Sequence, residues 1–251
     1  MDHEKILNLG AEMGRNLMSS GAEIYRVEES VHRLLTAYGF EPQVFAIPKM
    51  VLVSVTTPEG HPITRMCRVD GAATNIELLE QYNALCRELC RDVPDVDVAL
   101  EKLAGLRRST RSYSAWRQVG GYTATAAFFT LFFGGGVREF LCAALCGFVV
   151  GVCLMFGQRF TGTNMFFRTV VCSALLACLA WGLGAGLGAN TDQIAIGTLM
   201  VLVPGMALTN AMREIMAGDV FSGLHRTAEV ILVATAIALG TALPVVLERL
   251  L

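Results

Sequence analysis

Charge is divided unevenly along this chain of 251 residues, and that division limits the folds open to it. Residues 1–118 contain 14 Lys/Arg and 16 Asp/Glu. That share, about a quarter, is normal for a soluble domain. Residues 119–251 contain only 6 Lys/Arg and 6 Asp/Glu, too few to form an ordinary solvated surface. The sequence therefore excludes a single soluble globular domain and predicts a polar N-terminal domain joined to an integral membrane domain.

Uncharged apolar runs predict how the second half crosses the bilayer. A spanning helix needs about 20 predominantly apolar residues. Five segments approach that requirement: 119–136, 140–157, 169–189, 194–212 and 227–247. We therefore predict an α+β domain at residues 1–115, followed by an all-α membrane domain of five transmembrane helices at residues 116–251.

Arginines flank the five predicted spans asymmetrically. Only Arg138 and Arg249 lie on the side opposite the N-terminal domain. Eight lie on its own side: Arg107, Arg108, Arg111, Arg117, Arg159, Arg168, Arg213 and Arg226. Because cytoplasmic loops carry the excess of Lys and Arg, this asymmetry predicts a cytoplasmic N-terminal domain and a C-terminus outside.

Hydrophobic periodicity predicts the elements of the N-terminal domain. Apolar residues recur at helical spacing in four segments, at residues 3–20, 22–37, 75–91 and 96–106. Three further segments, at 44–47, 50–57 and 63–69, have strand character and are separated by turn residues. The pattern predicts a small antiparallel sheet with helices on one face.

The N-terminal domain contains side chains that could be assembled into a hydrolase site. Ser54 or Cys67 would serve as nucleophile, His61 as base and Asp70 as the group that orients it. No Gly-x-Ser-x-Gly elbow is present, however, and His61 lies in a turn beside Pro62. The sequence therefore predicts no catalytic residues, and it leaves a membrane-anchored hydrolase and an anchored ligand sensor as alternatives.

The cysteine spacing and the net charge give no indication of a metal site or of nucleic-acid binding. No cysteine pair has the spacing of a zinc site, so neither a metal nor a cofactor is predicted. The net charge of −2 provides no basic footprint for nucleic acid.

The sequence Val203-Pro204-Gly205 interrupts the fourth predicted span. Proline removes a backbone donor, and in lipid the freed backbone groups must be satisfied by protein, water or a ligand. Many transporters use such broken helices to bind an anionic substrate group at a half-helix N-terminus. We therefore predict a carboxylate-binding or gating site at Pro204, Gly205, Thr209, Asn210 and Arg213. The alternative is a plain proline kink, with Asn210 and Arg213 marking the approach to the interface.

A second group of polar and small residues is predicted to form a relay or an interface. It comprises Gly21, Glu23 and Arg26 in the first half, and Gly218, Asp219, Ser222, Gly223, Arg226 and Glu229 after the broken helix. Arg26 can reach Glu23 or Glu29 on the surface of a helix. Asp219, Arg226 and Glu229 are interpreted either as a proton or salt-bridge relay or as ordinary interface charges.

Several separated motifs resemble the threonine/serine exporter family over essentially the whole chain. They are Ser20-Gly21-Ala22-Glu23 with Arg26-Val27-Glu28, the strand at Met50–Thr57, and Leu202-Val203-Pro204-Gly205 with Thr209-Asn210, Arg213, Gly218-Asp219 and Ser222-Gly223. Full-length members of that family have more spans in one chain, so this chain is similar to the larger subunit of the split, two-component form.

The resemblance implies a function and a partner. It implies export of small carboxylate metabolites, succinate in the split form and threonine or serine in the fused form. The expected partner is a small multi-span membrane subunit (YjjB-like), assembled with this chain as an oligomer in the lipid bilayer of the bacterial inner membrane. The functional residues it implies are Gly21, Ala22, Glu23, Pro204, Gly205, Asn210, Gly218 and Gly223.

Overall fold

The computed structural model divides the chain into two compact units. It describes residues 3–57, 60–69, 74–109, 113–156 and 164–250. Unit 1 contains residues 1–111 together with 209–226, and unit 2 contains residues 112–208 together with 227–251. Residues 209–226, which follow the broken helix, thus belong to the same compact unit as the N-terminal residues.

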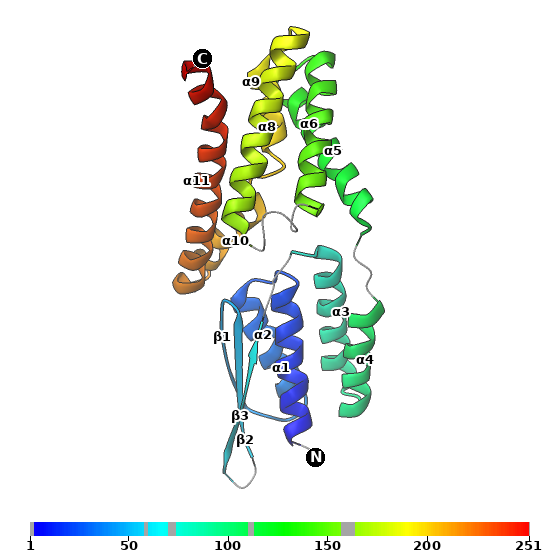
Figure 1. Cartoon of the computed structure of the whole chain (residues 1–251). Helices are drawn as coiled ribbons and strands as arrows, with labels where there is room; N and C mark the ends of the chain where they lie inside the picture. The colour runs from blue at the N-terminus through cyan, green and yellow to red at the C-terminus, as the bar shows by residue number, and fades with distance from the viewer. Residues whose placement is uncertain (1–2, 58–59, 70–73, 110–112, 157–163, 251) are drawn as a thin grey trace. The chain divides into compact units, whose positions relative to one another are not determined.

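Unit 1 has the predicted α+β composition (Figure 1). Within residues 1–111 its elements are α1 (His3–Ser19), α2 (Ile24–Ala37), β1 (Pro42–Ile47), β2 (Met50–Thr56), β3 (Pro62–Arg68), α3 (Ile76–Asp92) and α4 (Val96–Ser109). The three strands form an antiparallel sheet in the order β1-β2-β3, with Val53 of β2 opposite Val44 and Arg65. The predicted helices and strands of this half are therefore confirmed, with ends that differ by a few residues.

The core of unit 1 lies between the sheet and its helices. Val51, Val53 and Val55 of β2 are buried and alternate with half-buried neighbours, the pattern of a strand with one face on a core. The apolar stripes of α1 and α2 are buried, α1 against β2 and β3 and α2 against β1. Each large apolar side chain buried in this way contributes about 1.5–3 kcal/mol. The burial of these side chains between α1, α2 and the sheet agrees with the prediction that helices cover one face of the sheet.

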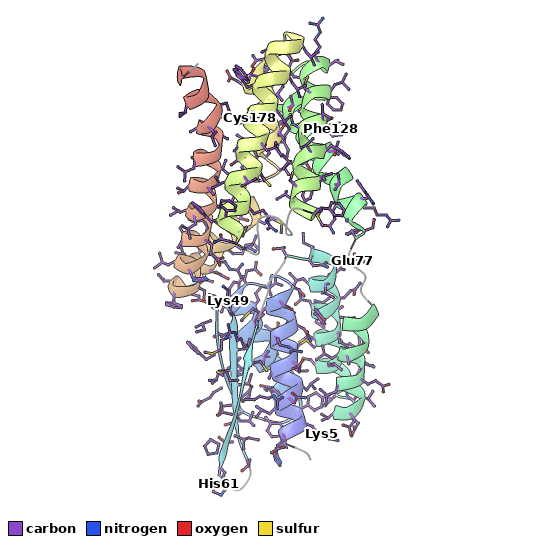
Figure 2. The ribbon with its side chains drawn as sticks, in the orientation of Figure 1. Lys5, Lys49, His61, Glu77, Phe128 and Cys178 are labelled. Carbon is purple, nitrogen blue, oxygen red and sulfur yellow. The ribbon has the colours of Figure 1, made fainter. Side chains whose placement is uncertain are left out.

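Unit 2 is entirely helical in the part that the structure describes. It contains α5 (Ala115–Phe132), α6 (Val137–Phe156), α8 (Met165–Leu187), α9 (Thr191–Leu199), the start of α10 (Gly205–Met216) and most of α11 (Val220–Leu250). Many of its exposed side chains are apolar, such as Phe128 at 64% exposure (Figure 2). Extended apolar surfaces of this kind are not stable in water and mark a membrane or protein contact.

The prediction of five spans is wrong in number. Among the described residues, three helices are long and apolar enough to cross a membrane: α6, α8 and α11 over Val220–Pro244. The first predicted span corresponds to α5, which starts with polar residues such as Arg117 and Gln118 and carries three threonines. The fourth predicted span is divided between α9 and α10, of 9 and 12 residues, and neither reaches spanning length.

The helix break in the fourth predicted span is confirmed. Helix α9 ends at Leu199, and α10 begins at Gly205 directly after Pro204. The carbonyl of Pro204 accepts the first helical bond of α10, from the N–H of Leu208 at 3.1 Å. Proline is tolerated at the start of a helix because the first turn has no use for its missing N–H.

Small residues let α5 and α6 approach closely inside unit 2. A Cβ added at Gly147 of α6 would lie 2.6 Å from the Cβ of Ala126 and 3.0 Å from the carbonyl oxygen of Tyr122, both on α5. A Cβ at Gly151, one turn later, would also contact Tyr122. Gly147 and Gly151 therefore allow the close helix approach that is needed in lipid, where no hydrophobic effect drives helices together.

Candidate functional site

A tight corner connects α1 to α2 in unit 1. Gly21 adopts φ +95°, a conformation that favours glycine, and ends α1. The N–H of Ala22 donates to the carbonyl of Leu17 and the N–H of Gly21 to that of Met18, both at 3.1 Å. This pair of bonds is a Schellman motif. Glu23 follows as the residue that precedes the first turn of α2.

A second corner of the same kind connects α10 to α11. Gly218 adopts φ +94°, and the N–H of Asp219 donates to the carbonyl of Glu214 at 3.0 Å. The Asp219 carboxylate then accepts the N–H of Ser222 at 3.1 Å, which caps the N-terminus of α11. Gly223 keeps α11 close to α10, because a Cβ there would lie 3.0 Å from the carbonyl oxygen of Ala211.

The two corners are joined by guanidinium groups. Arg213 of α10 donates from Nη1 to Oε1 of Glu23 at 2.6 Å, a link between positions 190 residues apart in sequence. Arg226 of α11 donates from Nη2 to the carbonyl oxygen of Ala22 at 3.1 Å. Both arginines therefore hold the segment after the broken helix against the α1–α2 corner.

Glu214 provides the third link and was not predicted. Its Oε1 lies 3.0 Å from Nε of Arg226 and accepts the N–H of Ile24 at 3.2 Å. Ile24 opens α2, whose first N–H groups have no partner inside the helix. A carboxylate at this position also suits the positive end of the helix dipole. Glu214 thus caps α2 from a distant part of the chain, whereas the Glu23 side chain makes no capping bond of its own.

Seven charged side chains at the two corners are named here the corner cluster. They are Glu23, Arg26, Glu28, Arg213, Glu214, Asp219 and Arg226. Glu23 is 4% exposed and Glu214 is 0% exposed. A buried carboxylate is costly unless it is paired and hydrogen-bonded, so these arginine contacts are required for the two corners to meet.

Burial and neighbouring charges shift the pKa values of three carboxyl groups in opposite directions. Burial raises the pKa of Glu23, but a backbone hydrogen bond and the Arg213 and Arg26 side chains outweigh it, so the net pKa is lowered. Burial raises the pKa of Glu214 above its ordinary value despite Arg226 and the Ile24 N–H, and Asp219 adds to the rise. Burial, with Asp219, also raises the pKa of Glu28, which accepts the N–H of Ala46 at 2.7 Å.

Most residues of the predicted relay or interface meet at the two corners. The members of that group found in this region are Gly21, Glu23, Arg26, Gly218, Asp219, Ser222, Gly223 and Arg226. The predicted pair between Arg26 and Glu23 is present at 3.7 Å. Glu229 lies beyond this region, on the exposed surface of α11 in unit 2.

The residues predicted to bind substrate are divided between the two units. Pro204 and Gly205 belong to unit 2, whereas Thr209, Asn210 and Arg213 belong to unit 1. Thr209 is exposed and Asn210 is half-buried on α10. Arg213 is paired with Glu23, so part of its charge is already compensated within the protein.

One sequence signal could have identified Glu214. It lies in the last turn of α10, two residues before the helix ends at Met216. A carboxylate at the negative end of a helix opposes the helix dipole, so its presence there calls for a compensating partner. Arg226 and the N-terminus of α2 are those partners, but only the fold reveals that they are near.

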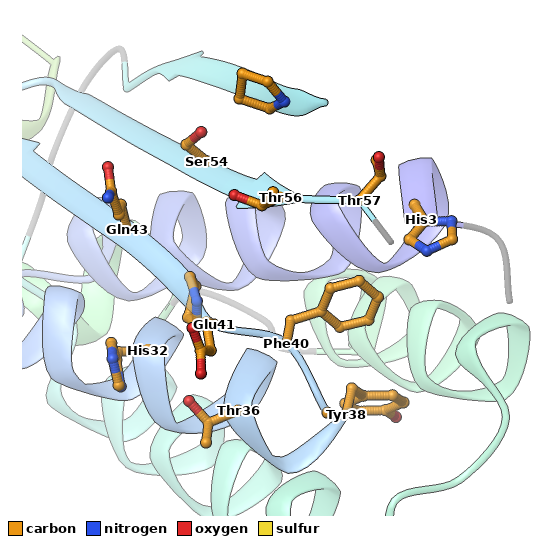
Figure 3. Close-up of a pocket in the computed structure, with 13 residues that line it drawn as sticks. His3, His32, Thr36, Tyr38, Phe40, Glu41, Gln43, Ser54, Thr56 and Thr57 are labelled. Carbon is orange, nitrogen blue, oxygen red and sulfur yellow. The ribbon is translucent and has the colours of Figure 1, made fainter. Parts of the chain in front are cut away.

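Ser54, the candidate nucleophile of a hydrolase, uses its hydroxyl for bonds within the sheet. Ser54 lines a cavity of about 1120 Å³ together with His3 and His32 (Figure 3). Its hydroxyl donates to the carbonyl of Ile63 at 3.3 Å and accepts from Thr64 at 2.9 Å, both within the β2–β3 hairpin. In Figure 3, His32 comes from α2 and Ser54 from the sheet, with Gln43 between them in this view. Asp70 lies outside the described residues.

The fold and the site define a multi-pass membrane protein with an N-terminal α+β unit, onto which the segment after a broken helix is docked. The family model ThrE, described as "Putative threonine/serine exporter", matches residues 8–247. The chain therefore belongs to the threonine/serine exporter family.

Curated relatives carry transporter and membrane-protein names. The "Threonine/serine exporter" of Corynebacterium glutamicum is 24% identical over all of this chain and 53% of its own length. The "Probable succinate transporter subunit YjjP" of Klebsiella aerogenes is 26% identical over 92% of this chain and 88% of its own. A "Pheromone-regulated membrane protein 10" of Pichia sorbitophila is 25% identical over 84% of this chain and 22% of its own. The chain thus spans about half the Corynebacterium relative. No solved structure matches it significantly.

Proposed function

We propose that this chain is a subunit of a secondary-type exporter for small carboxylate metabolites, either a succinate-like dicarboxylate or threonine and serine. The observation that carries the proposal is the family match over residues 8–247. The relatives named as a threonine/serine exporter and as a succinate transporter subunit support this substrate class. A transport role also gives the exposed apolar helices of unit 2 a purpose beyond anchoring, and it requires no catalytic residues.

The substrate site is assigned to the region around the helix break. Helix α10 starts at Gly205, so the positive end of its dipole lies at the break, and an anionic carboxylate is stabilised at such an end. Thr209 and Asn210 follow within the first two turns and supply side-chain donors. Arg213, one turn further, adds positive charge even though it is paired with Glu23.

The partner is a small multi-span membrane subunit (YjjB-like). The name of the Klebsiella relative, of which the match covers 88%, includes the word subunit, and this supports a two-component assembly. The asymmetry of the arginines supports a cytoplasmic N-terminal unit and an outward C-terminus in the bacterial inner membrane. Two of those arginines, Arg111 and Arg159, lie outside the described residues.

Metabolite export from cells tests the proposal directly. Cells expressing the chain with its partner are loaded with labelled succinate, threonine or serine, and the label in the medium is followed. Asn210→Ala is expected to lower the export rate by at least tenfold, because a lost charge-assisted bond to substrate is worth about 1.5–3 kcal/mol. Asn8→Ala, the same change at a half-buried position of α1, is the control and retains export. No export of any of the three metabolites by the assembled pair overturns the exporter proposal.

A further inference from the structure

Glu214 is a buried carboxylate with one oxygen left unpaired. Its Oε1 makes both contacts described above, with Nε of Arg226 and the N–H of Ile24. Its Oε2 is buried and has no hydrogen-bond partner among the described residues. The hydroxyl of Ser222, in the first turn of α11, is buried and unpartnered in the same way. An ionised oxygen in such a place is unfavourable, whereas a protonated one carries no charge to compensate.

The charges around Glu214 do not balance. Two charged groups act on it directly, Arg226 of α11 and Asp219 of the α10–α11 link. Glu28 of α2 interacts with Asp219, and Glu23, Arg26 and Arg213 interact with one another beside them. His225, next to Arg226, is exposed. With every acid and guanidinium ionised, the corner cluster has four negative and three positive charges. Uptake of one proton makes it neutral.

Geometry selects Glu214 as the group that takes this proton. Glu23 is paired with Arg213 at 2.6 Å and lies 3.7 Å from Arg26, which favours its ionised form. Asp219 uses its carboxylate to cap α11. Glu28 is only half-buried and accepts a backbone N–H. Glu214 alone among these four combines complete burial with an unpartnered oxygen, and its raised pKa agrees with that choice.

We propose that Glu214 is the proton-binding residue of the transport cycle, an inference that rests on the exporter function proposed above. A proton from the aqueous phase binds Oε2 and forms the neutral acid. The neutral acid still accepts the Ile24 N–H and no longer carries a buried charge, so the two corners stay together, and the Glu23–Arg213 pair stays in place. Loss of the proton to water restores the carboxylate, whose buried charge is then offset only by Arg226 and the Ile24 N–H, and the contact between the corners is weakened. Proton binding thereby controls how firmly the segment after the broken helix is held.

Infrared difference spectroscopy on the purified full-length chain in lipid nanodiscs tests the proton site without requiring transport. A step to lower pH is expected to produce a protonated-carboxyl band that is absent in Glu214→Gln. Glu29→Gln, at an exposed carboxylate paired with exposed Arg33, is the control and keeps the band. If the glutamine variant does not insert, Glu214→Asp is used instead, and the band is expected to shift in frequency. A Glu214→Gln spectrum identical to that of the parent overturns the proposal, as does an unshifted band in Glu214→Asp.

Export measured with the partner subunit separates this inference from the exporter function. In inverted vesicles, the external pH is varied and export of labelled carboxylate is expected to change by up to about tenfold per pH unit, the limit for one titrating group. Glu214→Gln is expected to abolish this pH dependence, and Glu29→Gln to preserve it. An unchanged pH profile in Glu214→Gln overturns the coupling role. Absence of export in the parent, together with a titrating Glu214 band, overturns the exporter function and leaves the proton site standing.

Discussion

Glu23 and Arg213 lie 190 positions apart in the sequence and form an ion pair of 2.6 Å between the α1–α2 corner and α10. The carboxylate side is almost fully buried, with 5% of the side chain exposed, while the guanidinium side is 57% exposed. The buried Glu23 charge is therefore neutralised by an arginine side chain that is itself more than half exposed to solvent. It ties the segment after the helix break to the N-terminal fold, and Glu214 and Arg226 repeat the same connection.

Removal of the arginine is expected to weaken this connection. Arg213→Met should lower the free energy of unfolding by about 1.5–3 kcal/mol, because it leaves the buried Glu23 without its charged donor. Arg33→Met removes a pair whose side chains are 72% and 54% exposed, and should cost less than about 1 kcal/mol. Thermal unfolding of the detergent-solubilised chain measures both. Equal losses in the two variants would show that the Glu23–Arg213 pair stabilises the protein no more than an exposed ion pair does.

The response to pH is expected to differ in sign for the two buried glutamates. The lowered pKa of Glu23 means that its contribution to stability is present above the ordinary value of 4.5 and is lost as the pH falls through the folded value. The raised pKa of Glu214 has the opposite effect: its contribution is full below 4.5 and is lost as the pH rises through the folded value. In Glu23→Gln, Tm should therefore fall less than in the parent as the pH is lowered into the acid range. In Glu214→Gln, Tm should fall less than in the parent as the pH is raised above 4.5.

A matched pair of variants checks this assignment. Glu29→Gln changes an exposed carboxylate on α2, the helix that Glu23 precedes, and should leave the shape of the Tm–pH curve unaltered. If Glu23→Gln and Glu214→Gln shift the curve in the same direction, the opposite pKa shifts inferred from the surroundings of the two side chains are wrong.

The local structure of unit 1 could be predicted from the sequence because it follows from short-range patterns. The stripe of Leu9, Met13 and Leu17 identifies α1, and the alternation of Val51, Val53 and Val55 identifies β2. The membrane half was harder because composition does not reveal where a helix stops. Residues 194–212 contain no charged side chain, yet the helix is interrupted between Leu199 and Gly205 and forms two short helices.

The candidate site was predictable only in part, for a physical reason. Gly21 and Gly218 could be identified as corners because a left-handed turn favours glycine. The partners of each corner could not, because hydrogen bonds between residues 190 positions apart leave no local pattern. Glu214 is marked in the sequence only as an acid at the unfavourable end of a helix, and only the fold shows that it is fully buried beside α2.

Close contact between α10 and α11 is expected to depend on Gly223. A methyl group there would overlap the Ile215 side chain and lie 3.0 Å from the carbonyl oxygen of Ala211, which is backbone and cannot rotate away. Gly223→Ala should therefore cost about 1–3 kcal/mol, the usual penalty for overpacking. Gly105→Ala on α4 is the control, since a Cβ there meets nothing within 4 Å. That change should be neutral or stabilising by up to about 1 kcal/mol. A stable Gly223→Ala protein with unchanged Tm would contradict the close packing described for this corner.

Packing between α5 and α6 is expected to depend on Gly147 in the same manner, but within the apolar unit. A Cβ at this position would lie 2.6 Å from the Cβ of Ala126 and 3.0 Å from the carbonyl oxygen of Tyr122, so the two helices would have to separate. Lipid tails replace lost helix contacts poorly when a close small-residue interface is opened. Gly147→Val should therefore lower Tm. It should also increase the mobility of a spin label attached at position 128, where the native Phe128 of α5 is exposed. Gly182→Val on α8, where a Cβ meets nothing within 4 Å, should leave both measurements unchanged. If the two valine variants behave alike, the α5–α6 contact does not depend on its small residues.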